Sequence, residues 1–97
     1  MPKFLFPSGQ IAITPGADDL LVRLNVHWIR LLARHMTGDW GNLDDEDKKA
    51  NDLAIENGMR ILSAYQFDHG NGQQENRIWV ITEADRSATT ILLPSEY

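Results

Sequence analysis

The chain has 97 residues, no cysteine and a formal net charge of −5 at pH 7. Its length predicts a single domain, residues 1–97, and the lack of cysteine excludes disulfide bonds and thiolate metal sites. A chain of this size buries roughly 60–65% of the surface of its unfolded state, so one modest hydrophobic core is expected. We predict a cytoplasmic protein with no membrane partner, because its apolar runs are too short for a signal peptide or a membrane span.

The acidity is concentrated in the middle third of the chain. Residues 37–58 hold seven acidic and two basic side chains, whereas residues 1–36 hold two acidic and four basic ones. Non-specific nucleic-acid binding requires a basic footprint, so direct nucleic-acid binding is not expected. A basic partner protein is compatible with this charge pattern.

The first half of the chain predicts a strand followed by two helices. Residues 8–13 have the pattern of a short strand. Thr14-Pro15 then signals a helix start, as an N-cap and a first-turn proline, and we expect this helix to continue to about residue 36. After a loop rich in turn formers, the acidic run 44–47 begins a second helix, which ends at Gly58 in a left-handed cap.

The first predicted helix is apolar around most of its circumference, which is typical of a largely buried helix. At about 100° per residue, a second apolar stripe and a narrow basic wedge lie beside its main apolar face. The stripe comprises Val22, Val26, Ile29 and Ala33. The wedge comprises Arg23, His27, Arg30 and Arg34. The stripe could contact the second helix, or it could form a homodimer interface.

The second half of the chain predicts three strands, at residues 59–67, 77–83 and 88–93. Asn71-Gly72 is a hairpin signal between the first two, and Pro94 ends the last, because proline cannot donate to a strand ladder. The sequence therefore predicts a two-layer α+β domain, in which a strand-helix-helix unit is followed by a three-stranded antiparallel meander. The strand order is not determined, because the first strand could pair at either edge.

The turn between the last two strands is one candidate site. Glu83 could act as a base, Arg86 could bind a phosphate or carboxylate, and Ser87 could act as a nucleophile or donor. The same residues also fit a solvated turn, which we favour. In that turn Asp85 and Ser87 accept backbone N–H groups and Arg86 pairs with an acid.

The loop after the first helix is a second candidate site. His35 and Asp39 could work together in acid–base chemistry, beside Trp40 and two glycines that shape the loop. The alternative, which we favour, places His35 at the helix C-terminus, where the helix dipole suits it. Trp40 would then pack the loop onto the core.

We expect neither a metal site nor a cofactor. His27, His35 and His69 lack the spacing of zinc ligands. The run 44–47 lacks the alternate ligand positions and the central glycine of a calcium loop. The sequence has no glycine-rich loop of the kind that binds a cofactor. The chain is also far too short for a methyltransferase, a class of enzyme that commonly uses such a loop.

Four blocks of the sequence carry a resemblance: His35 with Gly38-Asp39-Trp40-Gly41, Glu46-Asp47 with Asn51, Gly58 to Tyr65, and Ile81 to Tyr97. Together they resemble a small family of uncharacterised proteins encoded on bacterial plasmids, prophages and integrative elements. Members are often labelled plasmid-related proteins or type I restriction subunits. The resemblance covers nearly the whole chain and implies the context of a mobile genetic element.

The leading hypothesis is a non-catalytic accessory protein of a mobile element that binds a host or element-encoded protein. Its most specific form is an inhibitor of a host defence nucleoprotein, of a CRISPR or restriction system. The acidic start of the second helix would then meet a basic, nucleic-acid-facing groove. The predicted binding residues are Asp39, Trp40, Asp44, Asp45, Glu46, Asp47, Asp85 and Arg86.

Two alternatives remain open. The order of elements resembles that of RelE and barnase-like toxin ribonucleases, which suggests a ribonuclease or other phosphodiesterase. In that enzyme His35 or Glu83 would be the base. Arg86 would stabilise phosphate charge, and Ser87 or Thr89 would position the substrate. The second alternative is a structural homodimer that uses the second stripe of the first helix.

Overall fold

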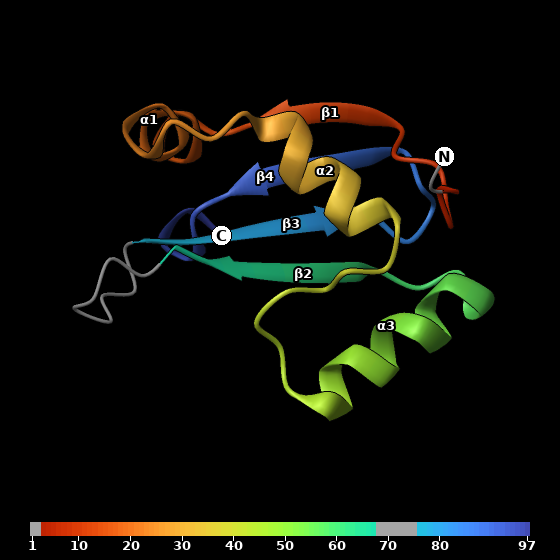
Figure 1. The fold of residues 1–97 in the computed structure, drawn as a ribbon. Coiled ribbons are helices and arrows are strands. Elements are labelled where there is room, and N and C mark those ends of the chain that lie inside the picture. The colour runs from red at the N-terminus through yellow and green to blue at the C-terminus, as the bar shows by residue number, and fades with distance from the viewer. Residues whose placement is uncertain (1–2, 68–75) are drawn as a thin grey trace.

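The computed structural model describes residues 3–67 and 76–97, and these residues form three α-helices and one four-stranded sheet (Figure 1). The predicted α+β class is confirmed. The hairpin signal Asn71-Gly72 lies outside the described residues. In chain order the elements are β1 (Gln10–Ile13), α1 (Pro15–Leu24), α2 (Trp28–Met36), α3 (Asp45–Asn57), β2 (Ile61–Gln66), β3 (Arg77–Thr82), β4 (Ala88–Leu92) and a 3-10 turn, η2 (Pro94–Glu96).

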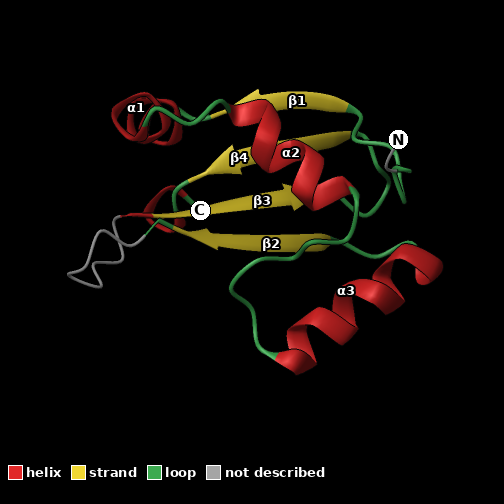
Figure 2. Ribbon diagram, in the orientation of Figure 1, coloured by secondary structure: helices red, strands yellow, loops and turns green. Residues whose placement is uncertain are grey.

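The strands lie in the order β1-β4-β3-β2. The pairs β2–β3 and β3–β4 are antiparallel and form the predicted meander, whereas β1 pairs parallel with β4. The sheet is therefore mixed and is not a pure antiparallel meander. Figure 2 shows α2 crossing one face of this sheet, with α3 beyond the β2 edge. No helix of the described residues is long and apolar enough to cross a membrane.

The prediction of one continuous helix from residue 15 to about residue 36 is wrong, because the chain breaks between α1 and α2. Asn25 adopts a left-handed conformation with φ of 56°, and its N–H caps the carbonyls of Leu21 and Val22. Asparagine tolerates this conformation better than most residues. His27 then caps α2, because its Nδ1 accepts the N–H of Ile29 at 3.2 Å. The predicted stripe and wedge consequently do not run along a single helix.

The start of α1 is tied to the C-terminal segment. Thr14 is the N-cap, as predicted, and its Oγ1 accepts the N–H of Ala17. The carboxylate of Glu96 accepts from Thr14 Oγ1 at 2.5 Å and from Gly16 N–H at 3.0 Å. These bonds, above all the one from Thr14, hold the pKa of Glu96 below its ordinary value. A negative charge at the N-terminus of α1 also complements the helix dipole.

Two hydrophobic clusters form the core. The larger cluster lies between the sheet and helices α1 and α2. Its buried side chains are Ala17, Leu20, Leu21, Leu31, Tyr65, Ile78, Val80 and Ile91. The smaller cluster joins the end of α2 and the N-terminal segment to α3. Its buried side chains are Phe6, Met36, Trp40, Ala54 and Ile61.

The outer edge of β2 is closed by hydrogen bonds from α3 and the loop before it. The Asn51 side chain donates to Leu62 O at 2.7 Å and accepts from Leu62 N–H at 3.2 Å. Next along the strand, Ala64 N–H donates to Trp40 O at 3.1 Å, and Asn42 N–H donates to Ala64 O at 2.6 Å. An edge strand is thereby satisfied without a fifth strand.

Replacing Asn51 by alanine should lower the free energy of unfolding by about 2 kcal/mol, because both backbone groups of Leu62 lose their partners. Urea denaturation measures this loss. Asn57→Ala, at an exposed position near the end of the same helix, is the control and should change stability little. Equal effects of the two substitutions would contradict a specific role of Asn51 at the β2 edge.

Candidate functional site

His35 lies at the end of α2 and is completely buried. Its Nδ1 lies 2.6 Å from Ser63 Oγ on β2, and its Nε2 lies 2.9 Å from Thr82 Oγ1 on β3. Thr82 Oγ1 lies 2.7 Å from Thr89 Oγ1 on β4, and Thr89 donates to the carbonyl of Ser8 at 2.8 Å. A chain of hydrogen bonds therefore links α2, three strands and the N-terminal segment.

The donor and acceptor at each step of this hydrogen-bond series follow from its last acceptor. A hydroxyl has one proton, and Thr89 gives its proton to the Ser8 carbonyl, which can only accept. Thr82 must then donate to Thr89, so that His35 Nε2–H donates to Thr82. His35 Nδ1 consequently accepts the hydroxyl proton of Ser63. His35 is thereby assigned as the neutral Nε2–H tautomer.

The surroundings of His35 keep its ring uncharged. Burial lowers the pKa of His35 from its ordinary value of 6.5 to about 3. The Phe6 ring packs edge-on against it with centroids 5.3 Å apart, and the Trp40 ring does so at 5.9 Å. Both ring nitrogens are bonded to hydroxyls and neither faces solvent. This geometry suits a structural role, in which His35 links α2 to the sheet, more than the role of a general base that contacts a substrate.

Asp39 pairs with Arg34. The Arg34 guanidinium donates through Nε to Asp39 Oδ2 at 2.7 Å and through Nη2 to Oδ1 at 3.3 Å. This pairing lowers the pKa of Asp39. Arg34 also lies 4.4 Å above the Tyr65 ring, whose hydroxyl donates to Asp39 O at 2.7 Å. No hydrogen bond joins Asp39 to His35 in the described chain, so these two candidates are not brought together as an acid–base pair.

Arg86 reaches the end of α3 and clamps it to the β3–β4 turn. Its Nη1 donates to Met59 O at 2.7 Å, Glu83 O at 3.1 Å and Ala84 O at 3.2 Å. Its Nη2 donates to Ala54 O at 2.9 Å. The guanidinium thus meets the negative end of the α3 dipole as well as the turn. Backbone carbonyls thus accept hydrogen bonds from both terminal nitrogens of the guanidinium.

The remaining groups of the β3–β4 turn are exposed. Glu83, Asp85 and Ser87 line a shallow, open depression. Asp85 Oδ1 accepts the Ser87 N–H at 3.0 Å, and hydrogen bonds from Ser87 lower the pKa of Asp85. Within the described residues, no hydrogen bond joins Ser87 to Glu83 or to His35. Asp85 therefore accepts a backbone N–H as predicted for a solvated turn, whereas the prediction that Arg86 pairs with an acid is wrong, because its guanidinium bonds to backbone carbonyls.

The acidic run at the start of α3 is solvent-exposed. Asp44 is the N-cap, and its Oδ1 accepts the Asp47 N–H at 2.8 Å. Asp45, Glu46 and Asp47 occupy the first turn, where negative charge is favoured by the helix dipole. No group of three or more potential ligands in the described parts of the chain is placed to hold a metal ion.

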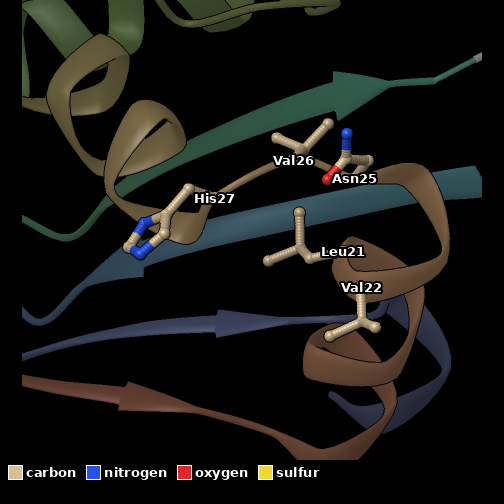
Figure 3. A pocket seen from close by; sticks show the side chains of 5 residues that line it. All are labelled: Leu21, Val22, Asn25, Val26 and His27. Atoms are coloured by element: carbon tan, nitrogen blue, oxygen red, sulfur yellow. The ribbon is translucent and has the colours of Figure 1, made fainter.

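The break between α1 and α2 creates a depression that the sequence did not reveal. Figure 3 shows its lining side chains, which are Leu21, Val22, Asn25, Val26 and His27. They are mostly apolar, and Val22 is 71% exposed. The depression offers shape and apolar surface but no charged side chain among its lining residues.

Sequence reasoning also missed Ser63, Thr82 and Thr89 as a connected group. A usable signal was present, because each of these polar residues lies two positions from an apolar residue of its strand and so shares the core face of the sheet. A buried polar side chain needs a partner, and His35 is the group that the three strand positions surround.

No family model, no curated protein and no solved structure matches this chain. The resemblance to mobile-element proteins therefore remains a hypothesis that depends on the sequence blocks alone.

Stability should fall as the pH drops below about 6.5, because the unfolded chain protonates His35 there while the folded chain does not until about pH 3. The loss should be about 1.4 kcal/mol per pH unit. Urea denaturation between about pH 7.5 and 5 measures it above the range in which carboxylates titrate. His35→Gln should be less stable at neutral pH and should lack this slope.

His27→Ser is the control for the pH experiment, because serine keeps an oxygen acceptor at the α2 N-cap. It should retain the wild-type slope. A slope that survives in His35→Gln and disappears in His27→Ser would show that His35 is not the buried neutral group.

Arg86→Gly should lower the free energy of unfolding by about 2 kcal/mol, because the four carbonyls that the guanidinium joins lose their donor. Glycine is chosen because it accepts the φ of 62° at this position without strain. Arg30→Ala, at an exposed position of α2, is the control for loss of a positive charge. Chemical denaturation should give a lower free energy of unfolding for Arg86→Gly than for Arg30→Ala. Equal values would contradict a structural role of the Arg86 side chain.

Proposed function

We propose that the protein acts by binding a basic surface of another protein through the outer face of α3, as an accessory protein of a mobile genetic element. The observation that carries this proposal is an acidic helix that is fixed at its inner side and exposed at its outer side. The proposal needs no catalytic group, which agrees with the internal use of His35 and Arg86.

Three sets of contacts fix the inner side of α3. Asn51 bonds to the β2 edge. Asp52 Oδ1 accepts the indole N–H of Trp40 at 3.1 Å. Ala54 O accepts from Arg86 near the end of the helix. Because the helix is held along its length, binding of a partner to its outer face would not carry the conformational-entropy cost of ordering the helix.

The outer face of α3 is net acidic, with three acidic side chains and one lysine, and it also carries one apolar side chain. At about 100° per residue, five exposed positions share this face. They are Asp45, Glu46, Lys49, Leu53 and Glu56. Leu53 is 57% exposed, and Met59 just beyond the helix is 61% exposed. Charge of this kind speeds encounter with a basic partner, and an apolar side chain within it can be buried at the contact.

The partner class follows from this chemistry. A basic groove that normally holds nucleic acid is a surface to which an acidic helix is complementary, and occupation of that groove would exclude the nucleic acid. We propose a host defence nucleoprotein as the partner, because the sequence blocks resemble those of mobile-element proteins. The protein would then act in the bacterial cytoplasm as an inhibitor.

Charge reversal on α3 should weaken this binding. Asp45→Lys combined with Glu46→Lys should reduce affinity by about tenfold or more at physiological salt, and wild-type binding should weaken as salt rises. The measurement is affinity capture from host lysate with quantitative mass spectrometry. Titration with the captured protein then gives the affinity.

Asp18→Lys combined with Asp19→Lys is the matched control, because it makes the same charge change at the start of α1. Both double variants remove two acidic side chains near the N-terminus of a helix, and the control also removes the exposed Asp19–Arg23 ion pair. The control should capture the partner as the wild type does. Equal binding by both variants, or salt-independent binding, would contradict the proposal.

A further inference from the structure

The two edges of the sheet differ. The edge of β2 is closed by α3 and its preceding loop, whereas the edge of β1 has no partner among the described residues. The N–H groups of Gln10 and Thr14 both donate toward β4, at 3.0 Å. Backbone groups alternate in direction along a strand, so those of Ile11 and Ile13 point away from the sheet.

Apart from its short length of four residues, β1 lacks the common protections of an edge strand. Edge strands commonly carry a charged side chain, a proline or a bulge that prevents pairing with another chain. Residues 4–17 contain no charged side chain, and this is the longest such stretch in the chain. β1 itself contains no proline and pairs with β4 in continuous register, without a bulge.

We propose that β1 pairs antiparallel with β1 of a second copy of this chain across a two-fold axis. In the register that uses the outward groups, Ile11 of each copy lies opposite Ile13 of the other, and the two residues exchange hydrogen bonds. Ala12 then lies on the axis opposite its own equivalent, with Cα atoms roughly 4.5 Å apart. The two sheets become one continuous sheet.

A second copy fits this edge for two reasons. A two-fold contact requires a self-complementary surface, and Ile11 and Ile13 each offer one donor and one acceptor in the same direction. Each copy carries a net charge of −5, so the repulsion between two copies is smallest where they meet at an uncharged surface. β1 is uncharged, and the acidic α3 lies at the opposite edge of the sheet (Figure 1). Pairing at β1 therefore keeps the two acidic helices far apart and leaves both accessible.

The test places charge on the two-fold axis. Ala12 is exposed, so a charged side chain is tolerated by the single copy. Sedimentation velocity over a dilution series should show a wild-type dimer. Ala12→Glu and Ala12→Lys should each weaken self-association by about fivefold or more, because like charges then face each other. An equal mixture of the two variants should restore association, as opposite charges meet on the axis.

Ala50→Glu and Ala50→Lys are the matched controls, because they make the same changes in net charge at an exposed position of α3. They should dimerise as the wild type does. The mixing step also tests folding, since two unfolded variants would not restore a dimer. Amide hydrogen exchange gives a second readout: the N–H groups of Ile11 and Ile13 should become protected as concentration rises.

Three results would overturn the proposal. The first is a wild-type chain that stays monomeric at the highest concentration. The second is a dimer that is unaffected by both Ala12 substitutions, and its loss in Val22→Glu would place the interface at the helices. The third is protection of Ile11 and Ile13 that appears only with a different protein, which would make β1 a site for a foreign strand.

Discussion

The fold depends on one buried, uncharged ring. His35 joins α2 to β2 through Ser63 and to β3 through Thr82, and the chain of hydroxyls continues to β4 and the N-terminal segment. Every donor in this hydrogen-bond series has one acceptor. A proton added to Nδ1 of His35 would make that nitrogen a second donor facing the Ser63 hydroxyl. Charge on the ring would therefore oppose both its burial and its hydrogen bonds. A neutral ring therefore strengthens the attachment of the sheet, α2 and the N-terminal segment to one another.

The polar residues of this chain divide into those used inside the molecule and those left outside. Arg86 and Asn51 both bond to backbone groups around α3, and Asp39 bonds to Arg34. These groups are occupied, whereas the two edges of the sheet leave surfaces that a partner can reach. One edge presents the acidic helix α3, and the other presents the uncharged strand β1. This distribution of polar residues favours binding of a partner protein at the surface over catalysis in a pocket.

The sequence predicted the class of the fold and the position of most elements, because alternation and capping signals act within a few residues. It could not predict the break at Asn25. Val26 continues the helical spacing of apolar residues, and a single residue in the left-handed conformation does not change that spacing. Parallel pairing of β1 with β4 depends on residues about eighty positions apart along the chain. For the candidate site, turn-forming and catalytic residues are of the same types, so Arg86 could be recognised as a clamp only once its acceptors were located.

The left-handed conformation of Arg86 explains why a chemically rich turn need not be a reactive one. A φ of 62° is costly for a residue with a side chain, and it persists where surrounding contacts over-determine it. Here the contacts are the carbonyls of α3 and the turn, and the guanidinium also lies 5.7 Å above the Phe6 ring, which covers His35. The strain at the turn is therefore offset by the attachment of α3. The helix that we propose as the binding surface is thus held by the same packing that keeps His35 buried and neutral.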